Sequence, residues 1–237
     1  MSVSPQIQER GRRLVEQLTG VALQARDLPA LGTAVRGEAS RLGMRCETDY
    51  LVHLEGDEAT DDRSCLVDLV VNNETYLFRE PQHFAVLKSL LLKRGEGAGW
   101  TAGQKLRVLS AGCATGEEAY SLAIELLGLE ECLPGLEFEI LGVDISQRAV
   151  EVARRGVYGP NSFRRIDDET RIDAWFEPRG DGTREVSERV KDHVAFECLN
   201  LRDGAAVRAV VGMVDAIFFR NVLIYLSDAA RLEVCHT

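Results

Sequence analysis

The stretch Leu106–Leu127, LRVLSAGCATGEEAYSLAIELL, decides the fold that we expect for this chain. It begins with a short leucine- and valine-containing run at 106–109, typical of a buried strand, and continues into a turn of small residues at 110–116. An amphipathic helix follows, led by the carboxylates of Glu117 and Glu118. Strand, glycine-containing turn and helix in this order indicate the first βα unit of a doubly wound parallel sheet, where a nucleotide-like ligand lies over the helix N-terminus.

Glu117 and Glu118 narrow the choice of ligand. A helix N-terminus carries about half a positive charge, and in dinucleotide-binding proteins it faces a pyrophosphate. Two carboxylates in the first turn would repel a diphosphate but suit a ligand with a cationic end. S-adenosylmethionine is such a ligand, because it carries a sulfonium and an ammonium and only one carboxylate. The alternative is that the two glutamates only stabilise the helix dipole.

The composition limits the class of protein and its partners. The 237 residues are 45% hydrophobic and 28% charged, as expected for one large globular domain or for a domain with a smaller helical one. A net charge of −10 argues against nucleic acid as a partner. No apolar run approaches the roughly 20 residues that span a bilayer, and the N-terminus lacks the apolar segment of a signal peptide. We therefore expect a cytoplasmic protein without membrane insertion.

The cysteines and histidines do not indicate a metal. The six cysteines are scattered, with no C-x-x-C pair and no His/Cys cluster at metal-ligand spacing. We therefore expect reduced thiols and no metal site.

Residues 4–93 are predicted to be mostly helical. Ser4-Pro5 is a typical helix start, and Gly20 a typical end. The segment 72–81, NNETYLFREP, interrupts the helices with polar and aromatic residues together, and loops of such mixed chemistry often carry function. The glycine-rich segment Arg94–Gln104 is the expected flexible boundary between the helical part and the sheet.

Three further apolar runs predict strands at 137–143, 194–199 and 214–219. The residues at or just beyond the ends of the four predicted strands are Gly112, Asp144, Asn200 and Asn221. Ligands of open α/β sheets bind at this carboxyl edge, and an acidic residue after the second strand is where a ribose diol binds. The alternative for that acidic residue is a cap on the following helix.

Four segments together resemble the chemotaxis receptor methyltransferases, the CheR family. These segments are NNETYLFREPQHF (72–84), AGCATGEEAYSLA (111–123), LGVDIS (141–146) and FFRNVLIYLS (218–227). The resemblance extends from about residue 10 to the end of the chain. It implies an α/β fold, a doubly wound Rossmann-like methyltransferase sheet preceded by a small all-helical domain. It also implies S-adenosyl-L-methionine as cofactor, S-adenosyl-L-homocysteine as product, and methyl ester formation on receptor glutamates in sensory adaptation.

The resemblance also implies roles for individual residues. The expected cofactor-binding residues are Asn73, Thr75, Arg79, Gly112, Glu118, Asp144, Asn200, Leu201, Arg220 and Asn221. Glu118 would bind the methionine end of the cofactor and Asp144 its ribose, while the loops at 200–201 and 220–221 would close over the adenine and the methyl centre. Arg79 and Tyr225 are expected to be catalytic, by orienting the substrate carboxylate.

The expected domains are an N-terminal helical domain with its linker at 1–80 and a methyltransferase domain at 81–237, with a small β-subdomain at about 176–193. In some members the subdomain binds a pentapeptide tether at the receptor's C-terminus. Here Thr183 stands between Gly182 and Arg184, so the glycine-then-arginine loop associated with that binding is absent. We expect the partner to be the cytoplasmic helical region of chemoreceptors, bound without the tether.

The end of the chain differs from the family pattern. Family members continue beyond the final helix into a closing β-hairpin, whereas this chain stops at Cys235-His236-Thr237, so C-terminal strands are expected to be missing.

Four arginines lie in or beside the second predicted helix. Those at positions 26, 36, 41 and 45 form either a solvated face or a substrate-docking surface.

Other functions remain as alternatives. One is a catalytically weak S-adenosylmethionine-binding or scaffold module in a chemosensory pathway. A NAD-binding dehydrogenase is disfavoured by the two glutamates and by the absence of G-x-G-x-x-G. Methylation of nucleic-acid bases fits less well, because Asn-Pro-Pro-Tyr is absent after the fourth predicted strand and Cys198 follows Glu197 within a strand.

Overall fold

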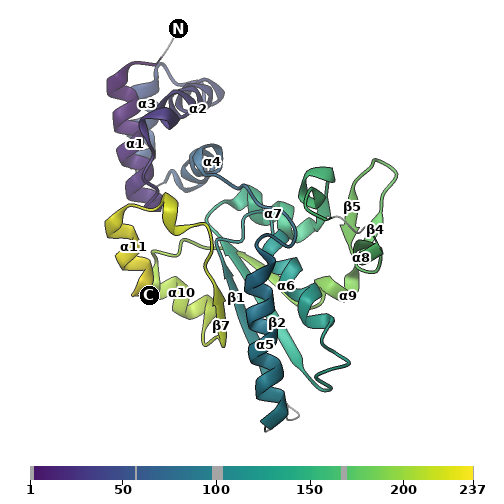
Figure 1. The fold of residues 1–237 in the computed structure, drawn as a ribbon. Helices are drawn as coiled ribbons and strands as arrows, with labels where there is room; N and C mark the ends of the chain where they lie inside the picture. Colours follow the sequence, from purple (N-terminus) through teal and green to yellow (C-terminus); the bar gives the residue numbers. More distant parts are fainter. Residues whose placement is uncertain (1–2, 57, 98–103, 167–169, 237) are drawn as a thin grey trace.

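The computed structural model describes residues 3–56, 58–97, 104–166 and 170–236. A helical unit at the N-terminus leads into an α/β unit with a parallel sheet, and a small antiparallel sheet lies at the far side of the α/β unit (Figure 1). Among these residues no helix is both long and apolar enough to cross a membrane.

Four helices form the N-terminal unit. They are α1 (Pro5–Thr19), α2 (Leu28–Arg41), α3 (Glu47–Glu55) and α4 (Thr60–Val70). The predicted start of α1 is confirmed, since the Ser4 hydroxyl accepts a hydrogen bond from the Ile7 amide. Apolar side chains one helical turn apart, such as Leu31 and Val35, are fully buried against Tyr50, which gives this unit a hydrophobic core of its own.

The central sheet contains the four predicted strands. These are β1 (Lys105–Ala111), β2 (Glu137–Asp144), β6 (Val194–Cys198) and β7 (Ala216–Phe218). All neighbours are parallel, in the order β6-β2-β1-β7. The chain therefore passes from β1 to β2 on one side and returns through β7 on the other. This reversal creates a topological switch point at the carboxyl ends of β1 and β7.

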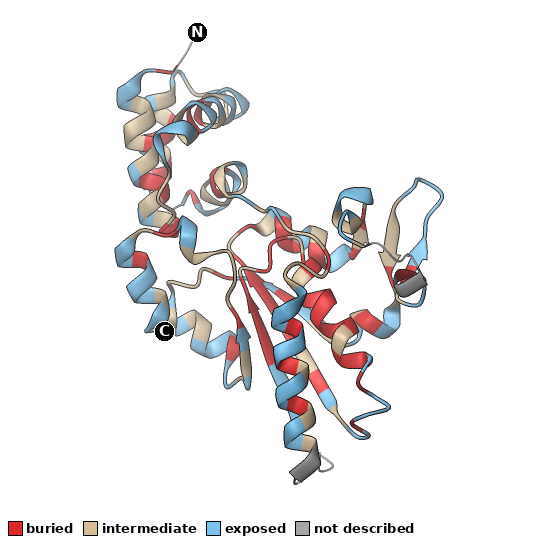
Figure 2. Cartoon of the chain, viewed as in Figure 1, coloured by how far each residue is buried: buried red, intermediate tan, exposed pale blue. Residues whose placement is uncertain are grey.

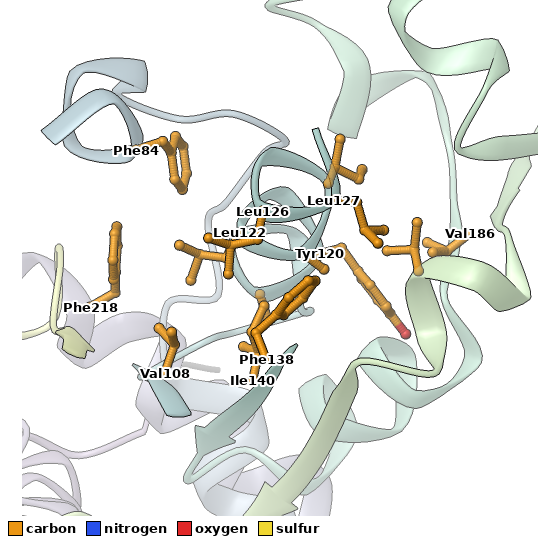
Figure 3. Close-up of a cluster of buried hydrophobic side chains, with 14 of the residues drawn as sticks. Phe84, Val108, Tyr120, Leu122, Leu126, Leu127, Phe138, Ile140, Val186 and Phe218 are labelled. Atoms are coloured by element: carbon orange, nitrogen blue, oxygen red, sulfur yellow. The ribbon is translucent and has the colours of Figure 1, made fainter. Parts of the chain in front are cut away.

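Helices cover both faces of the sheet. Alternate residues of β1 face opposite sides. Val108 belongs to the buried cluster that includes residues of α5 (Pro81–Gly97), α6 (Glu117–Leu127) and α7 (Gln147–Arg155), whereas Leu109 belongs to the cluster that includes Val211 of α10 (Gly204–Val211). Figure 2 shows α6 buried over most of its length. Figure 3 shows Leu122 and Leu126 of this helix among Val108, Ile140 and Phe138. The doubly wound α/β fold predicted from the sequence is confirmed.

The predicted boundary at Arg94–Gln104 is wrong, because the helix before it already packs on the sheet. α5 precedes this segment, yet its Phe84 is buried in the core of the sheet and stacks on Phe218 of β7 with ring centres 5.8 Å apart (Figure 3). The change from the helical core to the sheet core therefore comes earlier, near the linker 71–80. Residues 98–103 lie outside the described residues. The domain division at residue 80 remains a prediction.

The small antiparallel sheet is wider than predicted. It consists of β3 (Val157–Tyr158), β5 (Arg184–Val186) and β4 (Phe176–Pro178), in that order. A hairpin turn joins β4 to β5, and the Arg179 amide donates to the Thr183 carbonyl across it at 2.8 Å. β3, however, lies before the predicted range of 176–193. A strand of two residues is too short to produce an alternating pattern.

The remaining elements are short. They are 3₁₀ helices at Ala25–Asp27, Pro160–Phe163 and Leu223–Tyr225, and the helices α8 (Thr170–Asp173), α9 (Glu188–Lys191) and α11 (Asp228–Cys235). Within the described residues no further strand pairs with the outer side of β7. The expectation of missing C-terminal strands stays a prediction.

Candidate functional site

All the residues predicted to form the site line one cavity of about 600 Å³ at the carboxyl edge of the sheet. They are Asn73, Thr75, Arg79, Gly112, Glu118, Asp144, Asn200, Leu201, Arg220, Asn221 and Tyr225. The cavity also borders the end of α1 and the segment up to Asp27, so both units contribute to its wall. In Figure 1, α4, the start of α7 and the segment before α11 converge above the sheet.

The turn after β1 requires glycine at Gly112. Its φ of 75° lies in the left-handed region, and a β-carbon there would lie 2.2 Å from Cγ2 of Val222. The amides of Gly112 and Cys113 donate to the carbonyl of Val143, which fixes the turn to the end of β2. The turn and the loop after β7 therefore approach each other more closely than a side chain at position 112 would allow.

Glu118 forms the charged centre of the cavity. Ser110 donates a hydrogen bond of 2.7 Å to its Oε1, and Nη1 of Arg220 lies 3.4 Å from its Oε2. Burial raises the pKa of Glu118, and this effect is opposed by the bond from Ser110 and by the charges of Arg220 and Arg79. The carboxylate is thus a buried anion that a ligand cation would stabilise in its ionised form.

Arg220 has hydrogen-bonding capacity left over. Its side chain is 11% exposed, and its Nη2 donates to the carbonyl of Arg79 and to Glu80. Nε and Nη1 have no hydrogen-bond acceptor among the described residues. Because a buried N–H without an acceptor is costly, an anionic group of a ligand would satisfy this end of the cavity.

Glu117, unlike Glu118, lies outside the cavity. It is 3% exposed. Its carboxylate accepts hydrogen bonds from Thr115 at 2.6 Å and Ser162 at 2.8 Å, while burial raises its pKa. The Ser162 carbonyl accepts in turn from the Leu77 amide of the linker. Of the two glutamates that suggested a cationic ligand, only Glu118 can contact one, and Glu117 supports the linker.

Asp144 joins the ends of β1 and β2. Its Oδ2 accepts from the Ala114 amide at 2.8 Å and its Oδ1 from the Ser146 amide at 2.9 Å. It is 8% exposed, and burial raises its pKa. The two expectations for this residue are compatible: it braces the start of α7, whose N-cap is Ser146, and it lines the cavity. Each carboxylate oxygen can still accept one further hydrogen bond.

The linker aligns the predicted catalytic residues. Nη1 of Arg79 donates to the Glu74 carbonyl at 3.0 Å, which curls this side chain back along the linker. The side-chain amide of Asn72 donates to the hydroxyl of Tyr225 at 2.9 Å. Asn72 is therefore a site residue that the sequence did not single out. Its signal was its place in the polar and aromatic segment 72–81, which was expected to carry function.

The end of α1 closes the cavity, which the sequence did not indicate. Asn200 donates from its side-chain amide to the Leu18 carbonyl at 2.8 Å. The Ala22 amide donates to the Tyr225 carbonyl at 2.8 Å, and the Ser227 amide donates to the Gly20 carbonyl at 2.9 Å. Residues 18–22 are thus hydrogen-bonded to the loops after β6 and β7, although all of them are distant in sequence.

The chemistry of the cavity fits an amino-acid-linked nucleoside. Glu118 can accept from an ammonium, the spare N–H groups of Arg220 can donate to a carboxylate, and Asp144 can accept from a ribose diol. The volume of about 600 Å³ is within the range of small-molecule sites. These observations match S-adenosylmethionine, which carries all three groups.

The chain is similar to known methyltransferases over most of its length. Residues 73–237 match the family profile described as CheR methyltransferase, SAM binding domain. A probable biofilm formation methyltransferase WspC of Pseudomonas aeruginosa is 36% identical over 229 residues, which are 95% of this chain and 51% of that protein. A chemotaxis protein methyltransferase of Vibrio parahaemolyticus is 30% identical over 238 aligned positions, which cover 99% of this chain and 83% of that protein.

The chain spans about half the length of the WspC relatives. The matched profile is that of the S-adenosylmethionine-binding domain, so S-adenosylmethionine is the cofactor of this domain. The profile, the relatives and the cavity agree, and this chain belongs to the CheR methyltransferase family.

Proposed function

We propose that this chain transfers methyl groups to glutamate side chains in the cytoplasmic helical region of chemotaxis-type receptors, forming methyl esters. The observation that supports this most strongly is that Arg79, Glu118 and Tyr225 line one cavity at the switch point of the sheet. Glu118 would hold the methionine end of the cofactor there. Arg79 and Tyr225 would be left to bind an incoming carboxylate.

The reaction needs orientation more than acid–base chemistry. S-adenosylmethionine, when bound, supplies a methyl group on a positively charged sulfur. A substrate glutamate is already ionised at neutral pH, so no residue of the chain has to remove a proton. What the chain supplies is alignment of the carboxylate oxygen with the methyl group and exclusion of water, both of which lower the barrier.

Tyr225 and Arg79 suit this task. Because Asn72 donates to the Tyr225 oxygen, the hydroxyl can direct its own proton towards a substrate carboxylate. Arg79 is held at one nitrogen by the Glu74 carbonyl, so its guanidinium is oriented while its other N–H groups can bind a carboxylate. Together they would orient the substrate without changing its charge.

The names of two relatives guide the choice of candidate receptors. Both are named as biofilm formation methyltransferases, so candidate receptors should come from biofilm as well as chemotaxis systems.

Arg184 of the small sheet donates to Asp173 at 2.8 Å and lies over the ring of Phe163. Because this arginine is engaged within the subdomain, we propose that substrate recognition does not use a pentapeptide tether.

The test compares Arg79→Ala with the unsubstituted chain, using labelled cofactor and a receptor cytoplasmic fragment. We expect the turnover number to fall about a hundredfold, as is typical when a charged orienting group is lost, at equal melting temperature. Arg79→Lys is the matched control, since it keeps the charge but loses the planar fork, and we expect an intermediate rate. Unchanged turnover in Arg79→Ala would contradict this role of Arg79.

The scaffold alternative makes a different prediction. A non-catalytic module would bind S-adenosylhomocysteine by calorimetry yet form no methyl ester on any receptor fragment. Turnover above the level of a heat-inactivated sample would exclude it.

A further inference from the structure

Asp68 of α4 bonds to the beginning of α7. Its Oδ1 accepts a hydrogen bond of 2.7 Å from the Ser146 hydroxyl, and both of its oxygens lie 3.3 Å from the Arg148 amide. Asp68 belongs to the helical unit, whereas Ser146 and Arg148 belong to the α/β unit, 78 and 80 residues further along the chain. This carboxylate therefore joins the two units by a direct polar contact.

The contact continues into the cavity. Ser146 is fully buried, and its amide donates to Oδ1 of Asp144 at 2.9 Å. The other oxygen of Asp144 accepts from the Ala114 amide in the turn after β1. The path from Asp68 through Ser146 to Asp144 thus consists of two hydrogen bonds, and it ends on the residue that we expect to bind the ribose.

Capping of α7 alone does not account for Asp68. Ser146 already serves as the N-cap, because its hydroxyl accepts from the Ala149 amide at 3.1 Å. That hydroxyl also accepts a hydrogen bond of 3.4 Å from the side-chain amide of Asn73, so its own proton is directed towards Asp68. Asp68 therefore fixes the orientation of the Ser146 side chain, and with it the start of α7 that holds Asp144.

We propose that Asp68 is a positioning residue for cofactor binding, which links the placement of the helical unit to the geometry of Asp144. This inference rests on the proposed role of Asp144 as the ribose ligand. Asp68 does not line the cavity and would not touch the cofactor. Its effect would be to hold Asp144 in a geometry that accepts a diol before the cofactor arrives, which is the general benefit of preorganisation.

The test measures binding of S-adenosylhomocysteine by calorimetry in variants that fold. Asp68→Ala removes the contact, and alanine is favoured in helices, so α4 itself should persist. We expect the dissociation constant to rise about five- to tenfold, the equivalent of one ordinary hydrogen bond, because Asp68 acts on the cofactor only through Ser146 and Asp144. Asp61→Ala on the exposed side of α4 is the matched control and should bind like the unsubstituted chain.

Two further measurements separate positioning from a general loss of stability. Asp68→Asn keeps a carbonyl oxygen that can accept from Ser146 and Arg148, so it should restore binding to within about twofold of the unsubstituted chain. In Asp68→Ala without ligand, the amides of Ser146 and Arg148 should exchange hydrogen faster, while those of β1 should not change. Should Asp68→Ala not fold, Asp68→Ser, whose hydroxyl is too short to reach Ser146, carries the same test.

Each outcome decides the inference. Equal affinity in Asp68→Ala and the unsubstituted chain overturns it, and so does unchanged affinity in Asp144→Ala. Weaker binding in Asp68→Ala with rescue by Asp68→Asn supports it. Because binding is measured without a receptor, this result would stand even where no receptor fragment is methylated, and such a failure of methylation would contradict only the proposed function.

Discussion

Gly112 and Val222 lie so close together that a β-carbon on the glycine would come within 2.2 Å of Cγ2 of the valine. The two residues belong to the loops after β1 and β7, which are the neighbouring strands at the switch point of the sheet. Their contact sets the distance between the two loops that line the cofactor cavity. A side chain at position 112 would have to push the loop of Arg220 and Asn221 away from Glu118.

We therefore predict that Gly112→Ala weakens binding of S-adenosylhomocysteine strongly, by tenfold or more, and lowers the free energy of unfolding by about 2–4 kcal/mol. This sum contains roughly 1 kcal/mol for the left-handed backbone and 1–3 kcal/mol for overpacking. Calorimetry and urea unfolding measure the two effects.

Gly43→Ala is the matched control. Gly43 also has a positive φ of 66°, but no atom lies within 4 Å of the position of an added β-carbon. It should show the backbone effect without loss of binding. The double variant Gly112→Ala/Val222→Ala removes both Cγ atoms of the valine and should recover part of the affinity. Equal behaviour of Gly112→Ala and Gly43→Ala would mean that the contact with Val222 is unimportant.

Cofactor affinity should depend on pH through Glu118. Burial raises the pKa of Glu118 above the ordinary 4.5, and the ammonium of the ligand favours the ionised form. Binding therefore competes with protonation, and affinity should fall as the pH falls through this raised pKa, starting above 4.5. Glu118→Gln should bind about ten- to a hundredfold more weakly at neutral pH and lack this pH dependence. Calorimetry between pH 5 and 8 measures the affinity and its pH dependence. An unchanged pH profile in Glu118→Gln would mean that another group causes the pH dependence.

The stability of the ligand-free protein should have the opposite pH dependence at this residue. The folded state binds the proton of Glu118 more tightly than the unfolded chain does. The contribution of this group to stability is therefore fully present below pH 4.5 and is lost as the pH rises through the folded pKa. Comparing urea unfolding of the unsubstituted chain and Glu118→Gln shows this difference.

Tyr225→Phe should impair turnover and leave cofactor binding intact. The hydroxyl would donate a charge-assisted hydrogen bond to the substrate carboxylate, and its loss corresponds to a fall of about ten- to a hundredfold in kcat. Asn72→Ala, which removes only the donor that orients the hydroxyl, should reduce kcat less, by about threefold. A rise in the dissociation constant for S-adenosylhomocysteine in Tyr225→Phe would place the tyrosine at the cofactor instead.

Methylation should not require the receptor's C-terminal pentapeptide. The loop of the small sheet places Thr183 between Gly182 and Arg184, and this arginine is paired with Asp173. A receptor fragment with and without its last five residues should therefore be methylated with the same KM. A clear increase in KM for the shortened fragment would contradict tether-independent recognition.

The sequence predicted the sheet well because its two central strands, β1 and β2, are buried over most of their length and its edge strands still carry apolar runs. The stretch 216–219, for example, is apolar throughout, and the residue after each run falls at the same edge once the strands are parallel. For this reason the fold places Gly112, Asp144, Asn200 and Asn221 around one cavity, which residues of the linker also line. Their individual roles towards the cofactor remain predictions.

What could not be predicted depends on contacts between distant residues. Asn72 and Tyr225 are 153 positions apart, and no local pattern indicates that their side chains meet. The bonds of residues 18–22 to the loops after β6 and β7 are of the same kind. Local signals were also insufficient where elements are very short, as in β3, or weakly patterned, as in α10, whose eight residues were not predicted to be helical.

The most direct test of this account is alkali-released methanol from a receptor cytoplasmic fragment incubated with this chain and S-adenosylmethionine labelled in its methyl group. A glutamate methyl ester hydrolyses in alkali, so we predict volatile label that disappears when the accepting glutamates of the fragment are changed to alanine. The label should also disappear with Arg79→Ala. Binding of S-adenosylhomocysteine without any volatile label, or label that alkali does not release, would contradict glutamate methylation by this chain.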